Sequence, residues 1–433
     1  MTRLRLLAYI GAASLLVCGA GGYVALRWSG GPERAALKVQ LARAERLGLS
    51  TKMESLWPPA NDPAANAAPI YTSLSGSRRL LHPVTEELRK IGYPHSSKDA
   101  AAIDAALASV SSELVSIKEA AAMPECRFTR VASYDVLLPE YNPMRHGTWL
   151  LEASARRRSF AGDPIGAMQD LTIAARIGAQ MGIEPMLAIK GVQTKTESEI
   201  FQTAQEVLGK YGTRPEVRKE ARRMFAALGS PPDFKAGTGG EWAWRWAVVR
   251  AYEDGKMGLV DILRMAGFPS AKARFSKERT AFGIAMASPA GRARLTEAMA
   301  KVFLDYYEAL PSDPAKVEQA REARKAMDKA IASDPTKMVL AQIHIPFGAD
   351  SADLGGEAVA RRRLFLGLLN ALDTPTPPAS LPLKGSEAID PFSGKPFRYR
   401  ANPEEIRIWS VGPNVKDDMV AMWPRPGSTG DAR

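Results

Sequence analysis

The side chains best suited to acid–base or metal chemistry are few and dispersed along this sequence of 433 residues. The histidines are His82, His95, His146 and His344. None belongs to a His-Glu-x-x-His motif or has a partner at another metal-ligand spacing. His146 and Glu152 are the one close acid–base pair, and they could serve a hydrolase that acts on an envelope polymer. The pattern otherwise favours packed or surface histidines over catalytic ones.

Cys126 is the only cysteine besides Cys18, which lies in the N-terminal apolar run. A thiol and an imidazole can act as nucleophile and base when a fold brings them together, and Cys126 and His146 are the pair available. Cys126 follows Pro124 and Glu125 without any supporting signature. We therefore expect a buried structural thiol, and no intrachain disulfide in the rest of the chain.

Three other strings invite a functional interpretation and are better explained by structure. Residues 237–240, Gly-Thr-Gly-Gly, lack the Lys-Ser/Thr pair that holds phosphates, so we expect a flexible link. Trp242 and Trp246 share one helical face while Trp244 does not, which favours core packing over a platform for sugars or bases. Two basic clusters, 156–158 and 361–363, are expected to be solvated helix turns.

The formal net charge of +11 is distributed along the chain rather than gathered in a tail. Such a charge suits anionic lipid, anionic polymer or nucleic acid, but solvated helix faces explain it more simply. Nucleic-acid binding on the cytoplasmic face therefore stays an alternative function. The chain length allows two or three domains, each with its own core.

The elements that must position these residues are almost all helices, so the fold class is mainly α. Residues 33–350 are expected to form an irregular helical body without strands. In it, 97–117 carries one apolar stripe that predicts a single long helix, with Ser96 or Ser97 as its cap. Residues 144–160 and a second stretch from Pro164 or Ile165 to Met181, joined by Gly-Asp-Pro, predict a hairpin of the tetratricopeptide kind, but no repeat period supports a solenoid.

The N-terminal run from Leu6 to Leu26 is apolar, uncharged and just long enough to cross a bilayer as a helix. We expect a short tail at 1–5 and a transmembrane signal anchor at 6–27 in the inner membrane, with the bulk of the chain exported. Cys18 and Ala20 have the spacing of a signal-peptidase site, so cleavage is an alternative. Lipidation of Cys18 is another.

The composition changes near residue 351, and 351–423 is expected to form a small α+β module, with a disordered tail at 424–433. Residues 357–372 have a helical apolar stripe. Residues 397–400 and 406–410 alternate in the manner of half-buried strands, with turns at Ser393-Gly394 and Gly412-Pro413-Asn414. The pattern predicts a helix followed by an antiparallel β-hairpin.

Several short strings occur in a fixed order over roughly 120 residues of the helical body. They comprise Asn66, Ala67, Ala68, Pro69, Ile70, Tyr71, Cys126, Arg127, Phe128, Gly162, Asp163, Ala167, Asp170, Leu171 and Arg176. In these residues the chain resembles a set of uncharacterised membrane-anchored proteins of planctomycete-type bacteria. The resemblance implies architecture and membrane address only, with no activity.

The C-terminal module combines an Asp-Pro turn, alternating aromatic residues, a Trp-Ser-Val-Gly strand end and an acidic loop. The residues are Asp390, Pro391, Phe397, Tyr399, Trp409, Ser410, Val411, Gly412, Asp417 and Asp418. In these residues the module is similar to the soluble part of the major pseudopilin of type II secretion, over about a sixth of the chain. The resemblance implies a calcium site at Asp417 and Asp418, with a solvated turn as the alternative. The pseudopilin processing signal is absent, so the chain is not expected to be a fibre subunit.

These observations together predict a membrane-tethered, non-enzymatic scaffold or protein-interaction protein of the bacterial envelope. Its expected partners are the membrane, through Leu6 to Leu26, and an unknown protein, while nucleic acid is not favoured. No catalytic residue and no cofactor other than calcium is expected. The enzyme and nucleic-acid alternatives remain open from the sequence.

Overall fold

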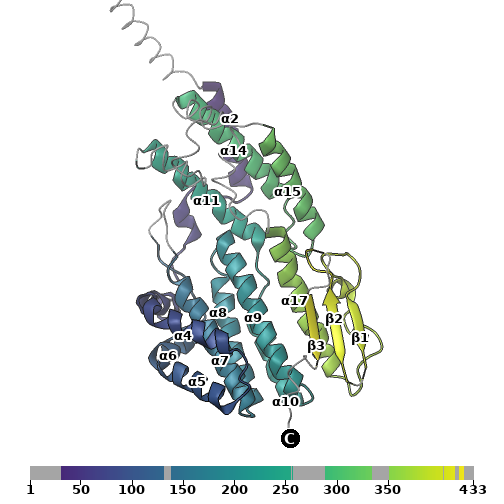
Figure 1. Ribbon diagram of the computed structural model, residues 1–433. Coiled ribbons are helices and arrows are strands. Elements are labelled where there is room, and N and C mark those ends of the chain that lie inside the picture. Colours follow the sequence, from purple (N-terminus) through teal and green to yellow (C-terminus); the bar gives the residue numbers. More distant parts are fainter. Residues whose placement is uncertain are drawn as a thin grey trace, which may run out of the picture. The chain divides into compact units, whose positions relative to one another are not determined.

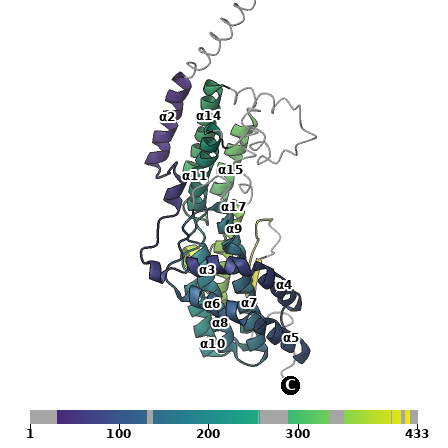
Figure 2. The same ribbon diagram turned by 90° about the vertical axis from the view of Figure 1, so that its left-hand side faces the viewer.

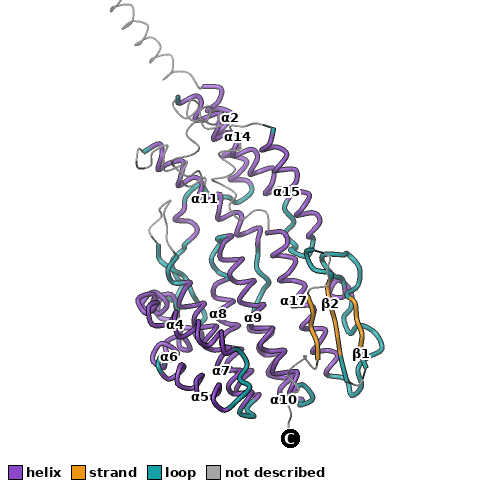
Figure 3. Tube along the Cα trace, in the orientation of Figure 1, coloured by secondary structure: helices purple, strands orange, loops and turns teal. Residues whose placement is uncertain are grey.

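The computed structural model describes residues 31–130, 138–254, 256, 288–333, 351–402, 404–414 and 419–423. In this part of the chain the protein is mainly helical, as predicted, and strands occur only near the C-terminal end (Figures 1 and 3). The predicted anchor at 6–27, the tail at 424–433 and the expected calcium ligands Asp417 and Asp418 lie outside the described residues.

Residue contacts divide the chain into two compact units. The first unit comprises Met1–Lys52, Glu241–Leu310 and Glu322–Gly348. The second unit comprises Met53–Gly240, Pro311–Arg321 and Ala349–Arg433, and it therefore includes the predicted C-terminal module.

The first unit is built around the pairing of α2 (Gly31–Arg46) with α14 (Pro289–Ala309). Arg43 of α2 donates to Asp305 at 2.7 Å and to Glu308 at 2.7 and 2.9 Å, which joins the two helices at their surface. Trp242 and Trp246 are buried with Phe303 in the core of this unit, so the predicted packing role of the two indoles is confirmed.

The N-terminal part of the second unit consists of short helices (Figure 2). These are α3 (Ala68–Leu74), α4 (Arg78–Ile91), α5 (Ser97–Ala108) and α6 (Ser111–Ala122), with 3-10 turns at Met53–Leu56, Pro63–Ala65 and Ser75–Ser77. The prediction of one long helix across 97–117 is wrong, because the backbone leaves the helical region at Val110, whose side chain is fully buried. The axes of α5 and α6 consequently differ by 74°. Of the two predicted caps, Ser96 and Ser97, it is Ser96 that forms the N-cap of α5.

Among the residues that the structure describes, no single helix is both long enough and apolar enough to cross a membrane. The bent pair of α5 and α6, taken together, is long and apolar enough, by length and composition alone.

Helices α7 (Tyr141–Phe160) and α8 (Pro164–Met181) form the antiparallel hairpin that the sequence predicts. Gly162 has a φ of 84°, which favours glycine, and Asp163 caps α8 by accepting a hydrogen bond of 2.9 Å from the Gly166 N–H. Fully buried alanines on both helices allow the backbones to approach closely. They are Ala155, Ala167, Ala174 and Ala175.

Helices α9 (Leu187–Tyr211) and α10 (Pro215–Ala227) continue this layer, followed by α11 (Phe234–Glu253). The glycine-rich string expected to be a flexible link is instead the start of α11. Gly237 and Gly240 lie three residues apart on it, against the backbone at Pro185 and Leu187. A Cβ at position 240 would lie 1.6 Å from the Pro185 carbonyl oxygen, so the glycines serve helix packing.

The C-terminal part begins after α15 (Val317–Ala332), with α17 (Ser351–Leu372), which packs on the sheet and on α9 (Figure 1). The sheet order is β1-β2-β3, all antiparallel: Arg398–Ala401, Ile406–Ser410 and Met419–Trp423, with a 3-10 turn at Gly385–Ala388 before it. The predicted hairpin corresponds to β1 and β2. The third strand was missed because its sequence, MVAMW, is apolar throughout and shows no alternation.

Asp390 is the polar centre of this C-terminal module and is almost fully buried. Its carboxylate accepts hydrogen bonds from the Ser410 hydroxyl at 2.8 Å and the Val411 N–H at 3.1 Å, at the end of β2. It also accepts from the Phe392 N–H and the Ser393 hydroxyl of its own turn. The hydrogen bonds of Asp390 therefore join the Asp-Pro turn to the Trp-Ser-Val-Gly end of β2, and we call this junction the C-terminal corner.

Candidate functional site

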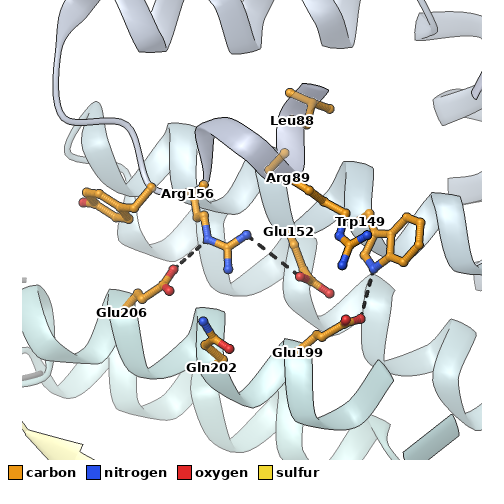
Figure 4. Close-up of a pocket in the computed structure, with 11 residues that line it drawn as sticks. Leu88, Arg89, Trp149, Glu152, Arg156, Glu199, Gln202 and Glu206 are labelled. Atoms are coloured by element: carbon orange, nitrogen blue, oxygen red, sulfur yellow. Dashed lines mark hydrogen bonds and ion pairs between the residues drawn. The ribbon is translucent and has the colours of Figure 1, made fainter. Parts of the chain in front are cut away.

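A polar pocket of about 360 Å³ lies between α4, α7 and α9 in the second unit (Figure 4). This volume is at the lower end of the range for small-ligand sites. Its wall from α4 and the following turn comprises Leu88, Arg89, Gly92 and Tyr93; α7 contributes Trp149, Glu152, Ala153 and Arg156; α9 contributes Glu199, Gln202 and Glu206.

Helical spacing explains why these side chains converge. Residues 152, 153 and 156 lie three, four and seven positions after residue 149, and residues 202 and 206 lie three and seven positions after residue 199. Such residues share one face of a helix, and α7 packs against both α4 and α9. α7 and α9 therefore each direct a mainly polar stripe into the same space, to which α4 adds Arg89.

Glu152 is the least satisfied polar group of the pocket. Its side chain is only 5 % exposed, and its Oε1 atom has no hydrogen-bond partner. Oε2 lies 4.0 Å from Arg156, too far for a hydrogen bond. Burial, together with the nearby carboxylates of Glu199 and Glu206, raises the pKa of Glu152 to about 8, against the opposing effect of Arg156 and Arg89. At neutral pH the carboxyl group is therefore mostly protonated.

The neighbouring groups are bound to one another. Trp149 donates its indole N–H to Glu199 at 3.0 Å, and Arg156 donates to Glu206 at 2.7 Å (Figure 4). The guanidinium of Arg89 lies 4.4 Å from the centre of the Trp149 ring, within cation–π distance. These pairs fix the side chains around Glu152 before any ligand enters.

His146, the expected partner of Glu152, is buried beside the pocket and does not line it. A hydrogen bond of 2.8 Å joins its Nδ1 to the Thr85 hydroxyl, and its ring lies edge-on to Trp149 and His82. Burial lowers the pKa of His146 to about 4, so the imidazole is neutral and a weak base. Its contacts are those of a packed histidine.

Cys126 is a buried free thiol, as expected. Burial raises its pKa to about 12, with a further contribution from Glu184. The thiol therefore stays protonated and unreactive at neutral pH. Nearby, Glu184 accepts hydrogen bonds from Tyr141 at 2.9 Å and from the Trp57 indole, which makes this a structural cluster.

The two arginine clusters are only partly solvated: Arg157 and Arg158 stay at the surface in ion pairs, whereas Arg156 and Arg362 point inward. Arg157 pairs with Asp104 at 2.8 Å, Arg158 with Asp170 at 3.0 Å, and Arg156 lines the pocket. Arg362 is 7 % exposed and makes two hydrogen bonds to Glu197. Its burial was not predictable from the sequence, because Arg361 and Arg363 on either side make the three residues look like one solvated cluster.

The described residues contain no metal-binding cluster to add to the predicted calcium site. Among the residues that the structure describes, no group of three or more His, Cys, Asp or Glu side chains could hold an ion. The expected calcium ligands, Asp417 and Asp418, fall outside those residues, so the calcium site stays a prediction.

Comparison with protein-family models, with curated proteins and with solved structures gives no match for this chain. The pocket must therefore be interpreted from its own residues. Of these, sequence reasoning singled out Glu152 and missed Glu199, Gln202 and Glu206. Their spacing along one helix was a visible signal, but charged residues at that spacing usually belong to a solvated face.

Proposed function

We propose that this protein is a non-enzymatic interaction protein, tethered to the envelope membrane by Leu6 to Leu26. Its pocket between α4, α7 and α9 receives a polar side chain of a protein partner. The observation that carries the proposal is the buried, unpartnered Oε1 of Glu152 at the pocket. A buried acceptor without a partner costs about 1–3 kcal/mol, and a bound donor would recover part of that free energy.

The arrangement of the other side chains supports binding. The pairs Trp149–Glu199 and Arg156–Glu206 hold the walls in place, and preorganised walls reduce the entropy that a ligand must lose. Cys126 and His146, the two groups best suited to nucleophilic or base catalysis, have contacts that make them unreactive. A binding role therefore uses more of the observed chemistry than a catalytic role does.

The test is a pull-down of the full-length protein from solubilised membranes. We compare the wild type with Glu152→Gln and with Glu87→Gln, which removes an exposed carboxylate of α4 outside the pocket. A reproducible protein partner that is lost from the first variant and kept by the second supports the proposal. Identical partner sets for all three proteins would refute the role of the pocket.

A hydrolase of an envelope polymer is the second candidate, favoured by the convergence of three carboxyl groups in one pocket. Hydrolysis of a glycosidic bond requires one protonated carboxyl group as acid and one carboxylate as base or nucleophile. Glu152 has the raised pKa of such an acid, and Glu199 and Glu206 lie beside it. Release of reducing sugar ends from purified envelope polysaccharide, abolished by Glu152→Gln, would select this function instead.

A further inference from the structure

When Glu152 is ionised, the negative charges of the residues that line the pocket outnumber the positive ones. Three carboxylates, Glu152, Glu199 and Glu206, then face two guanidinium groups, Arg89 and Arg156. The residues that line the pocket then carry one excess negative charge, and none when Glu152 is protonated, while Arg89 is also paired with Glu86 outside the pocket at 3.1 Å. One bound monovalent cation would balance the ionised state.

The position of this excess charge is defined by the hydrogen bonds. Glu199 already accepts from Trp149, and Glu206 already accepts from Arg156. The carboxylate of Glu152 accepts from neither arginine within hydrogen-bond distance, and its Oε1 is buried at the pocket. A cationic donor that enters the pocket would therefore meet Glu152 as its unoccupied acceptor.

The remaining lining residues indicate the form of the cation. Leu88, Ala153 and the ring of Tyr93 offer apolar contact, which suits an alkyl chain. An ammonium group is a compact charge with three donors, and the pocket supplies several carboxylate oxygens. We propose that the pocket binds the primary ammonium group of a lysine-type side chain of the partner, with Glu152 as its counter-ion.

Binding of this cation is coupled to loss of the Glu152 proton. The ligand enters as an ammonium ion, and the carboxylic acid of Glu152 releases its proton to the solvent as the ion pair forms. Burial has the largest effect on this titration, and the charged groups that act on it are Arg156 from α7, Glu199 and Glu206 from α9, and Arg89 from α4. Below the pKa of Glu152, which burial raises to about 8, the affinity should rise about tenfold per pH unit.

The test is isothermal titration calorimetry of the full-length protein in detergent, with Nα-acetyl-lysine amide as the probe. Its Nε-acetylated form is the uncharged comparator. We expect binding of the first probe only, an affinity about tenfold higher at pH 7.5 than at pH 6.5, and release of close to one proton at pH 6.5, measured in buffers of different ionisation enthalpy. Glu152→Gln should lower the affinity about tenfold or more and abolish proton release, while Glu87→Gln should match the wild type.

Three results would overturn the inference: no binding of the charged probe, equal binding of the acetylated probe, or binding without proton release. The wild-type pH dependence keeps the test decisive even if Glu152→Gln fails to fold. The inference rests on the proposed function, but different results would refute the ammonium ligand and the interaction role. Loss of a partner from Glu152→Gln without any binding of the probe would refute the ammonium ligand alone. Proton-linked binding of the probe with unchanged partners would refute the interaction role alone.

Discussion

Arg362 of α17 holds Glu197 of α9 through two hydrogen bonds of 2.8 Å, one from Nε and one from Nη2. The pair is buried, and the same guanidinium also donates to the carbonyl oxygens of Leu228, Gly229 and Ser230. One side chain therefore joins α17 to α9 and to the end of α10. This contact ties the C-terminal module to the helices that carry the pocket.

Replacement of Arg362 should be strongly destabilising. Arg362→Met would leave the Glu197 carboxylate buried without a counter-ion, so we expect the free energy of unfolding to fall by about 3–5 kcal/mol. Urea denaturation followed by circular dichroism measures the change. Arg223→Met is the control, because Arg223 is exposed and pairs with Glu220 one turn away, and its loss should cost less than about 0.5 kcal/mol. Equal effects of both substitutions would contradict this assignment.

Glu152 should make the protein less stable as the pH rises. Its pKa is raised to about 8 in the folded state, above its ordinary value, so between pH about 5 and about 8 the folded state binds a proton that the unfolded state has lost. The free energy of unfolding contributed by this group then decreases by about 1.4 kcal/mol per pH unit over that interval. Glu152→Gln should remove this slope, which denaturation curves at pH 5.5, 6.5 and 7.5 would show. A slope that persists unchanged in the variant would be evidence against the raised pKa.

Asp390→Asn should weaken the C-terminal corner. An amide cannot accept all the hydrogen bonds that the carboxylate takes from Ser410, Val411, Phe392 and Ser393, so we expect a loss of about 1–3 kcal/mol. Hydrogen exchange of the β2 amides should become faster. Glu404→Gln, at an exposed position of the same module, provides the comparison and should leave exchange as it is.

Cys126 should resist alkylation in the folded protein. With a pKa of about 12, only about one thiol in ten thousand is ionised at pH 8, and the side chain is 2 % exposed. Iodoacetamide labelling, with mass spectrometry of the peptide that contains Cys126, should detect modification only after addition of denaturant. Rapid labelling without denaturant would show that the thiol is accessible.

Gly240→Ala should disrupt the packing of α11. The added Cβ would overlap the carbonyl group of Pro185, which belongs to the backbone and cannot rotate away. We expect a loss of at least about 3 kcal/mol, measured as a lower thermal midpoint. Gly76→Ala is the matched control, because nothing lies within 4 Å of a Cβ at that position.

The fold was largely predictable from the sequence, whereas the pocket was not. Local signals such as the Gly-Asp-Pro turn and the alternation at 397–410 act within a few residues, and the α7–α8 hairpin and the pairing of β1 with β2 follow from them. The break at Val110 and the helical state of 237–240 depend on tertiary burial, which overrides local preference. The pocket needs three helices to meet, and the sequence does not state which charged faces are covered by a neighbour.

The two glycines of α11 also limit how the chain length can change. Successive residues of an α-helix are rotated by about 100°, so one residue inserted between Gly237 and Gly240 would turn the second glycine away from the Pro185 backbone and bring a side chain into its place. The number of residues between these two glycines is therefore fixed by the packing of α11 against the Pro185 backbone.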